Sequence, residues 1–235
     1  MIYDAILFDL DGTLLPMDND AFTKGYLGLL SAVAEKAGGY DREMFIKGMW
    51  KGVYAMVKND GSCKNEDVFW KMTADVLGDE IYKHVPVFDR FYENEFHEAK
   101  KLTGPNPLAM EAIRLARSKA KKVILATNPL FPTVAVHSRL SWINVKPEVF
   151  DWITDYTNSS TCKPNPAYYK EICEKFGLDP EKCLMIGNNA QEDVEAGRAA
   201  GMSTFLVTDW LINNGEMPDC PQGSFKDLIS YLEQL

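Results

Sequence analysis

The chain has 235 residues, of which 46% are hydrophobic and 25% are charged, and its formal net charge is −9. This length supports a sizeable buried core, as one large domain or as a main domain with an insert. The negative charge argues against nucleic acid or an anionic membrane as the main partner, and no stretch approaches the ~20 apolar residues of a membrane span. Five cysteines without a C-x-x-C pair and an N-terminus unlike a targeting segment favour a cytoplasmic protein.

The first predicted element is a short buried strand over residues 6–8, and it leads into two aspartates separated by one leucine. Asp9 and Asp11 point the same way in an extended backbone. Two like charges held together are costly unless a cation or a shared proton offsets them. The pair is typical of an Asp-Gly turn. It is also typical of a site that holds a hard cation such as Mg²⁺, in which one aspartate is the nucleophile and the other moves a proton. Residues 9–13 alone do not distinguish these interpretations.

Residues 18–99 have helical periodicity. Apolar side chains recur at helix-face spacing in four successive segments of this region. Turn-rich joints at residues 16–20 and 102–107 bound it on both sides. We therefore predict a small helical bundle over residues 18–99, inserted into a core domain formed by residues 1–17 and 100–235.

Beyond residue 107, short apolar strands alternate with helices. The predicted helices cover residues 108–118, 166–176, 192–200 and 225–232, and the predicted strands cover 123–127, 152–154, 183–187 and 204–207. This alternation predicts an α/β fold, with a Rossmann-like parallel sheet that carries helices on both faces. Ligands in such folds bind beyond the carboxyl ends of the strands.

Polar side chains follow several of these predicted strands or precede a helix. They are Asp9, Asp11, Thr127, Asn128, Lys163, Asn188 and Asp193. Brought to one sheet edge, they form a set suited to holding a phosphate dianion beside a metal ion. Lys163 and the metal would neutralise charge on the transferring oxygens, and Thr127 would donate a hydrogen bond to one of them.

The order of these motifs resembles the haloacid dehalogenase-like (HAD) hydrolase superfamily over nearly the whole chain. D-x-D-G-T at residues 9–13, the strand-ending Thr127, Lys163 followed by proline, and residues 187–193 match its four motifs, and the helical insert matches its cap. The resemblance implies that Asp9 is a nucleophile that forms an aspartyl-phosphate. It also implies that Asp11 protonates the leaving oxygen and then activates water.

Two further residues are candidates for phosphate binding. Thr13 belongs to the first motif, and Asn128 follows Thr127. Asn128 also precedes a proline, and Asn-Pro is a common turn signal. The amide of Asn128 therefore either lies near the phosphate or simply ends the strand.

The fourth motif departs from the family pattern at the position of a metal ligand. The resemblance implies that Mg²⁺ is bound by Asp9, the backbone carbonyl of Asp11 and the fourth motif, where an aspartate is usual and this chain has Asn188. An amide oxygen can ligate Mg²⁺ without adding charge, so we expect weaker Mg²⁺ affinity. Asp193 is retained, and by resemblance it either ligates through water or holds Lys163. Glu192 is expected to face about 100° away from Asp193 on a helix.

The sequence thus predicts a Mg²⁺-dependent phosphomonoester hydrolase for a small phosphorylated metabolite, with a cap that closes over the substrate. Asn188 motivates an alternative, a weakened family member that binds a phosphorylated ligand or a protein partner without turnover. Phosphoryl transfer to an acceptor other than water is a third possibility. Periodicity does not fix which cap side chains face the site, so substrate identity stays open, as does the oligomeric state.

Overall fold

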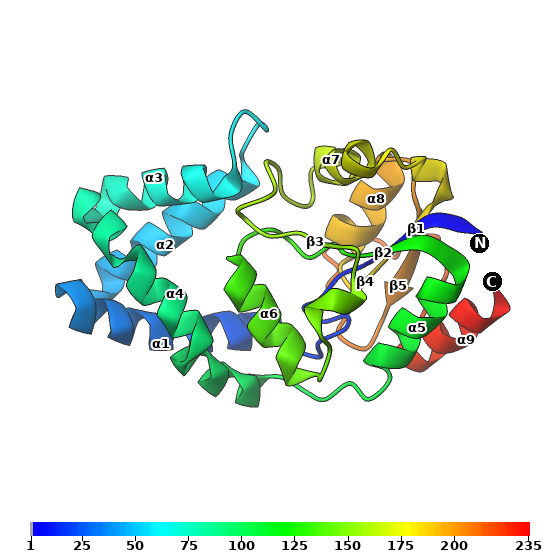
Figure 1. Cartoon of the computed structure of the whole chain (residues 1–235), viewed down its shortest axis with the longest axis horizontal. Coiled ribbons are helices and arrows are strands. Elements are labelled where there is room, and N and C mark those ends of the chain that lie inside the picture. Colours follow the sequence, from blue (N-terminus) through cyan, green and yellow to red (C-terminus); the bar gives the residue numbers. More distant parts are fainter. Residues whose placement is uncertain (1) are drawn as a thin grey trace.

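The computed structural model describes residues 2–235, which form a six-stranded parallel sheet with a helical region beside it (Figure 1). The strands are β1 (Tyr3–Phe8), β2 (Ala120–Leu125), β3 (Trp152–Ile153), β4 (Cys183–Gly187), β5 (Ser203–Val207) and β6 (Gln222–Gly223). Their order is β3-β2-β1-β4-β5-β6, and each neighbouring pair is parallel. This order confirms the α/β, Rossmann-like fold and places β1 between β2 and β4.

Helices cover both faces of the sheet because successive side chains of a strand point to opposite sides. Ile6 and Phe8 of β1 belong to the apolar cluster that includes α5 (Ala109–Lys119) and α9 (Phe225–Gln234). Leu7 belongs to a second cluster, which includes side chains of α7 and α8. Those helices are α7 (Ala167–Phe176) and α8 (Ala196–Ala199). Both faces of β1 are therefore buried, as its continuous apolar run predicts.

The inserted helical region lies to one side of the sheet in Figure 1. Its helices are α1 (Asn19–Gly38), α2 (Arg42–Val57), α3 (Asn65–Leu77) and α4 (Val85–Glu93), with 3₁₀ turns η1 (Asp79–His84) and η2 (Glu95–Leu102). Asp18 and Asp41 begin α1 and α2 by accepting hydrogen bonds from backbone N–H groups. The two connections to the core lie side by side, since Met17 forms a β-bridge with Thr103. The predicted four-helix insert is confirmed, and its exact boundaries stay a prediction.

One helix of the structure was not predicted from the sequence. α6 (Thr133–Trp142) follows β2 and packs against α4, between the sheet and the insert. Its buried side chains include Ser138 and Arg139 as well as apolar residues, so its apolar periodicity is weak. The helix expected over residues 192–200 is also different. It begins as a π-helical turn, η5 (Ala190–Glu195), and becomes α-helical only in α8.

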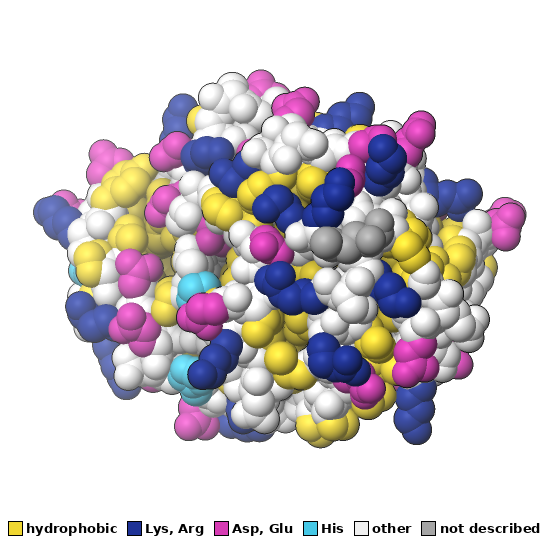
Figure 2. All heavy atoms as spheres, turned by 45° about the vertical axis from the view of Figure 1, so that its right-hand side comes forward, with side chains coloured by type: hydrophobic (Ala, Val, Ile, Leu, Met, Phe, Trp, Pro, Cys, Tyr) yellow, Lys and Arg dark blue, Asp and Glu magenta, His cyan; other side chains and the backbone are white. Residues whose placement is uncertain are grey.

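The described surface carries charges of both signs. On the face shown in Figure 2, Lys and Arg side chains alternate with Asp and Glu and with small apolar patches. Within residues 2–235, no helix has both the length and the hydropathy that crossing a membrane requires.

Candidate active site

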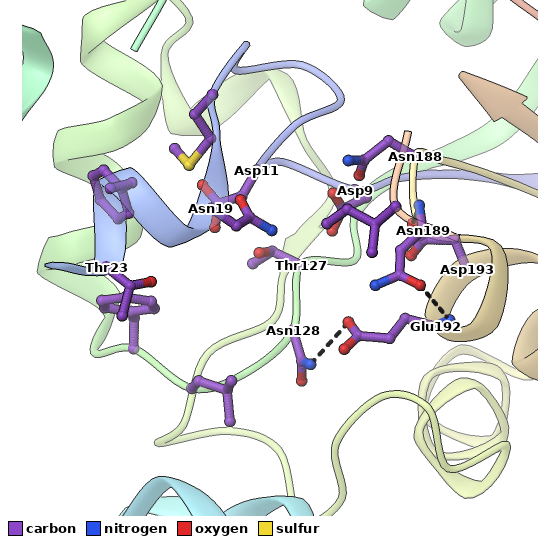
Figure 3. Close-up of a pocket in the computed structure, with 15 residues that line it drawn as sticks. Asp9, Asp11, Asn19, Thr23, Thr127, Asn128, Asn188, Asn189, Glu192 and Asp193 are labelled. Carbon is purple, nitrogen blue, oxygen red and sulfur yellow. Dashed lines mark hydrogen bonds between the residues drawn. The ribbon is translucent and has the colours of Figure 1, made fainter. Parts of the chain in front are cut away.

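A pocket of about 170 Å³ lies at the carboxyl ends of β1, β2 and β4 (Figure 3). Parallel strands end at a common edge, so the loops that follow them converge there. Of the predicted site residues, those lining the pocket are Asp9, Asp11, Thr127, Asn128, Asn188 and Asp193. Thr13 and Lys163 are not in the lining but contact it through hydrogen bonds to Asp9. The structure thus brings all eight predicted residues together, although they lie up to 184 positions apart in the chain.

Asp9 is a buried carboxylate with a partner on each oxygen. Lys163 Nζ donates to Oδ1 at 2.9 Å, and Thr13 Oγ1 donates to Oδ2 at 3.1 Å. Burial raises the pKa of Asp9 to about 7; Lys163 opposes the rise, and Asp193 and Asp11 add to it. The carboxylate of Asp9 is therefore placed where an additional cation would stabilise it.

Lys163 is a fully buried cation between two carboxylates. Its Nζ donates to Asp193 Oδ1 at 2.7 Å as well as to Asp9. Burial alone would lower the pKa of Lys163, but Asp193 and Asp9 outweigh it and raise that pKa well above its ordinary value. Asp193 Oδ2 accepts the backbone N–H of Asn189 at 2.9 Å. Both oxygens of Asp193 are thus occupied, one by the lysine and one by the loop.

The amide of Asn188 is oriented by two hydrogen bonds. Its Nδ2 donates to the backbone carbonyl of Trp210, and its Oδ1 lies 3.1 Å from Thr13 Oγ1, whose one proton is shared between this oxygen and Asp9 Oδ2. Thr13 therefore lies against both Asn188 Oδ1 and Asp9 Oδ2. Gly12 makes this approach possible, because its φ is +81° and a Cβ there would lie 2.2 Å from Asn188 Nδ2.

The oxygen donors at this point fit a hard cation. Within residues 2–235, no three His, Cys, Asp or Glu side chains are grouped to hold a metal ion. The available donors are instead the carboxylate of Asp9 and the amide oxygen of Asn188, both buried and both facing Thr13. Mg²⁺ prefers oxygen ligands, keeps several waters and is usually bound through one or two carboxylates together with phosphate oxygens of the substrate. The set therefore suits Mg²⁺ but has a single carboxylate at its centre.

Arg139 of α6 is a site residue that the sequence did not indicate. Its side chain is fully buried, and Nη1 donates to Asp11 Oδ2. Nε donates to the carbonyl of Ala135, and the guanidinium lies 4.2 Å from the ring centroid of Phe131. Asp11 Oδ1 is buried and makes no hydrogen bond within the described chain. Arg139 thus occupies one oxygen of Asp11 and leaves the other unpaired.

Thr127 and Asn128 end β2 at the pocket. The backbone carbonyl of Thr127 accepts hydrogen bonds from Thr154 Oγ1 at 2.8 Å and from the Tyr168 hydroxyl at 2.9 Å. Asn128 Nδ2 donates to Glu192 Oε2 at 3.1 Å and to the carbonyl of Lys163 at 3.4 Å. These two acceptors fix the amide orientation and leave Asn128 Oδ1 buried, with no partner in residues 2–235.

Glu192 lines the pocket together with Asp193, but its carboxylate has a different partner, since Oε2 accepts from Asn128 Nδ2. Glu192 lies in the π-helical turn η5, in which the N–H of Ala196 bonds to the carbonyl of Gln191, five residues earlier. Asn189 caps this turn by accepting from the N–H of Glu192 at 3.1 Å (Figure 3). Burial raises the pKa of Glu192 above its ordinary value.

Comparisons with known proteins agree with this architecture. Pyrophosphatase PpaX of Bacillus pumilus (strain SAFR-032) is 25% identical, with 97% of this chain and 95% of that protein covered. Phosphoglycolate phosphatase of Aquifex aeolicus (strain VF5) is 26% identical, with 97% and 96% covered.

Solved structures share the fold over the full length. The putative HAD-hydrolase YfnB of Bacillus subtilis, bound to magnesium, has a TM-score of 0.61 at 18% identity, with 99% of this chain and 100% of that chain covered. A HAD phosphatase of Thermococcus onnurineus has a TM-score of 0.60 at 17% identity, with 97% of both chains covered. The family model described as haloacid dehalogenase-like hydrolase matches residues 3–201. The chain therefore belongs to the haloacid dehalogenase-like hydrolases.

Proposed function

We propose that this protein is a Mg²⁺-dependent phosphomonoester hydrolase that acts on a small phosphorylated metabolite through an aspartyl-phosphate. The observation that carries the proposal is the position of Asp9, a buried carboxylate in the pocket lining, held by Lys163 on one oxygen and Thr13 on the other. The names of two relatives, a pyrophosphatase and a phosphoglycolate phosphatase, support phosphoryl chemistry.

The pocket residues divide the reaction into two displacements. An oxygen of Asp9 attacks phosphorus while the bond to the leaving oxygen breaks, and Asp11 gives its proton to that oxygen. Asp11 then takes a proton from water, whose oxygen attacks phosphorus and displaces Asp9, so that phosphate is released. Lys163 and Thr127 donate to the non-bridging oxygens, where charge is concentrated. Asn128 lies beside them, but its Nδ2 already donates to Glu192 and to the Lys163 carbonyl.

The residues that would hold Mg²⁺ are Asp9, Asn188 and Asp11, the last through its backbone carbonyl. When bound, it supplies positive charge to the phosphoryl oxygens. We assign Asp193 to holding Lys163, since both of its oxygens already accept hydrogen bonds. The test of the function is phosphate release from 4-nitrophenyl phosphate with Mg²⁺, Mn²⁺ or Co²⁺. Absence of release with every metal overturns the hydrolase proposal.

Replacing Asn188 with aspartate is expected to lower the Mg²⁺ concentration for half-maximal activity by about tenfold, because it adds a charged oxygen ligand. Mg²⁺ titration of activity measures this, and calorimetry of Mg²⁺ binding measures it without substrate. Asn189→Asp is the matched control, since it adds the same charge one residue away and still caps η5. An equal change in both variants would contradict ligation by residue 188. A silent wild type with an active Asn188→Asp variant would favour the non-catalytic alternative.

Arg139 is expected to act by positioning Asp11. Arg139→Lys keeps the charge but loses the planar group that pairs with Asp11 and stacks on Phe131. We expect kcat on an alkyl phosphate to fall about 100-fold, because an alkoxide leaves only with a proton. On 4-nitrophenyl phosphate, whose leaving group needs no proton, we expect a fall of less than about tenfold.

The ratio of these two kcat values separates positioning from a general loss of structure. Arg117→Lys on α5 is the control, because its side chain is partly exposed and pairs with Asp151 away from the pocket. Equal losses of Arg139→Lys on both substrates would show that Arg139 only supports the fold.

A further inference from the structure

We infer that the pocket selects phosphate esters whose leaving group carries hydroxyl or amino groups and no second anion. The inference rests on the proposed hydrolase function and adds the substrate class. It comes from the charges that line the pocket, from the state of the nearby cations and from an unpaired acceptor in the lining (Figure 3).

The pocket lining contains acids but no base. Its four carboxylates are Asp9, Asp11, Glu192 and Asp193, and among the described residues that line it none is Lys, Arg or His. The remaining polar side chains are amides and hydroxyls, and Asn19 and Thr23 of α1 supply one of each on the cap side. A second anion on the substrate would therefore meet neutral or negative groups.

The cations behind the lining are already paired. Lys163 contacts Asp9 and Asp193, and Arg139 contacts Asp11, and both cationic side chains are fully buried. The pocket therefore has four carboxylates and only two cations beside it. The two negative charges left over are the charge that one Mg²⁺ would offset. The phosphate dianion then uses the remaining attraction of Lys163 and the metal. Arg139 Nη2 is buried without a partner in residues 2–235, but Arg139 is not among the lining residues, so the lining itself offers no cation to a carboxylate or a second phosphate.

An unpaired acceptor of the lining calls for a donor on the ligand. Asn128 Oδ1 is a buried acceptor without a partner in residues 2–235, whereas the other unpaired oxygen, Asp11 Oδ1, is the one that carries the proton in the proposed reaction. A buried acceptor left unpaired costs free energy, so a ligand that donates to it gains affinity. A hydroxyl donates and an ammonium donates, whereas a carboxylate or phosphate only accepts.

Three phosphate esters with two-carbon leaving groups of nearly equal size test the inferred substrate class. They are 2-hydroxyethyl phosphate, phosphoethanolamine and 2-phosphoglycolate, which end in a hydroxyl, an ammonium and a carboxylate. We expect kcat/KM with Mg²⁺ to be about tenfold or more higher for each of the first two than for 2-phosphoglycolate. Pyrophosphate, which also carries a second anion, is expected to be as poor a substrate as 2-phosphoglycolate.

Adding a cation to the pocket tests whether the absence of positive charge in the lining causes this substrate preference. Thr23→Lys places an ammonium on α1 at the lining. We expect it to reduce, by about tenfold, the ratio of kcat/KM for 2-hydroxyethyl phosphate to kcat/KM for 2-phosphoglycolate. Ala21→Lys adds the same charge two residues earlier on α1, at an exposed position outside the lining, and is expected to leave the preference unchanged. Intrinsic differences in ester reactivity cancel when each variant is compared with wild type.

The outcomes separate this inference from the proposed function. If 4-nitrophenyl phosphate is hydrolysed and 2-phosphoglycolate or pyrophosphate is the best of the small substrates, the hydrolase stands and the inferred class is wrong. If nothing is hydrolysed, the hydrolase proposal fails. The class is then decided by calorimetry of the three esters on wild type with Mg²⁺, where tighter binding of 2-phosphoglycolate overturns it.

Discussion

Asp9→Asn is expected to abolish phosphate release, with kcat on 4-nitrophenyl phosphate lower by at least about four orders of magnitude. The amide keeps the size of the carboxylate but is a poor nucleophile, so no aspartyl-phosphate forms. The amide oxygen is still able to accept from Lys163 or from Thr13, so the pocket is expected to keep its shape. Release of coloured nitrophenol measures the loss directly.

The same substitution is expected to leave the fold intact. Lys163 keeps its second carboxylate partner, Asp193, at 2.7 Å in this variant, so a neutral amide at position 9 is expected to cost little. Thermal unfolding in EDTA tests this without the contribution of a bound metal. Asp4→Asn on the same strand is the control, because Asp4 pairs with Lys121 at the surface. Comparable loss of activity in both variants would rule out Asp9 as the specific nucleophile.

The sheet and the residues at its edge could be predicted from the sequence for one physical reason. Strands buried on both faces have continuous apolar runs, and the polar residues that follow such runs lie at the carboxyl edge. Asp9, Thr127 and Asn188 follow three such runs, and all three line one pocket. The four helices of the insert were predictable because their apolar stripes keep the helical period. The roles of the site residues remain proposals.

The residues that sequence reasoning missed depend on contacts that periodicity does not encode. Arg139 is buried in α6 and pairs with Asp11, 128 positions earlier, and a buried charge inside a helix weakens the apolar pattern that would predict the helix. An ordinary helix was expected over residues 192–200, whereas η5 is π-helical, and apolar periodicity does not encode that difference. The sequence left two alternatives for Asp193, and the hydrogen bonds of Asp193 to Lys163 and to the loop support the second of them.

Lys163→Met is expected to reduce both activity and stability. It removes a positive charge beside the reacting phosphoryl group, which is expected to lower kcat by about 10²–10³-fold. It also leaves Asp9 and Asp193 buried without their shared cation, at a cost of about 3–5 kcal/mol of unfolding free energy. For a chain of this size the midpoint of thermal unfolding is expected to fall by about 10 °C. Lys170→Met is the control, since Lys170 is exposed on α7.

The double variant Lys163→Met with Asp193→Asn separates the two roles of the lysine. Removing both members of a buried ion pair is less costly than removing one, so the double variant is expected to be more stable than Lys163→Met by about 1–3 kcal/mol. Activity is not expected to return, because the charge that Lys163 places 2.9 Å from Asp9 Oδ1 is still missing. Recovery of phosphate release together with stability would mean that Lys163 acts only by neutralising Asp193, and would remove it from the proposed chemistry.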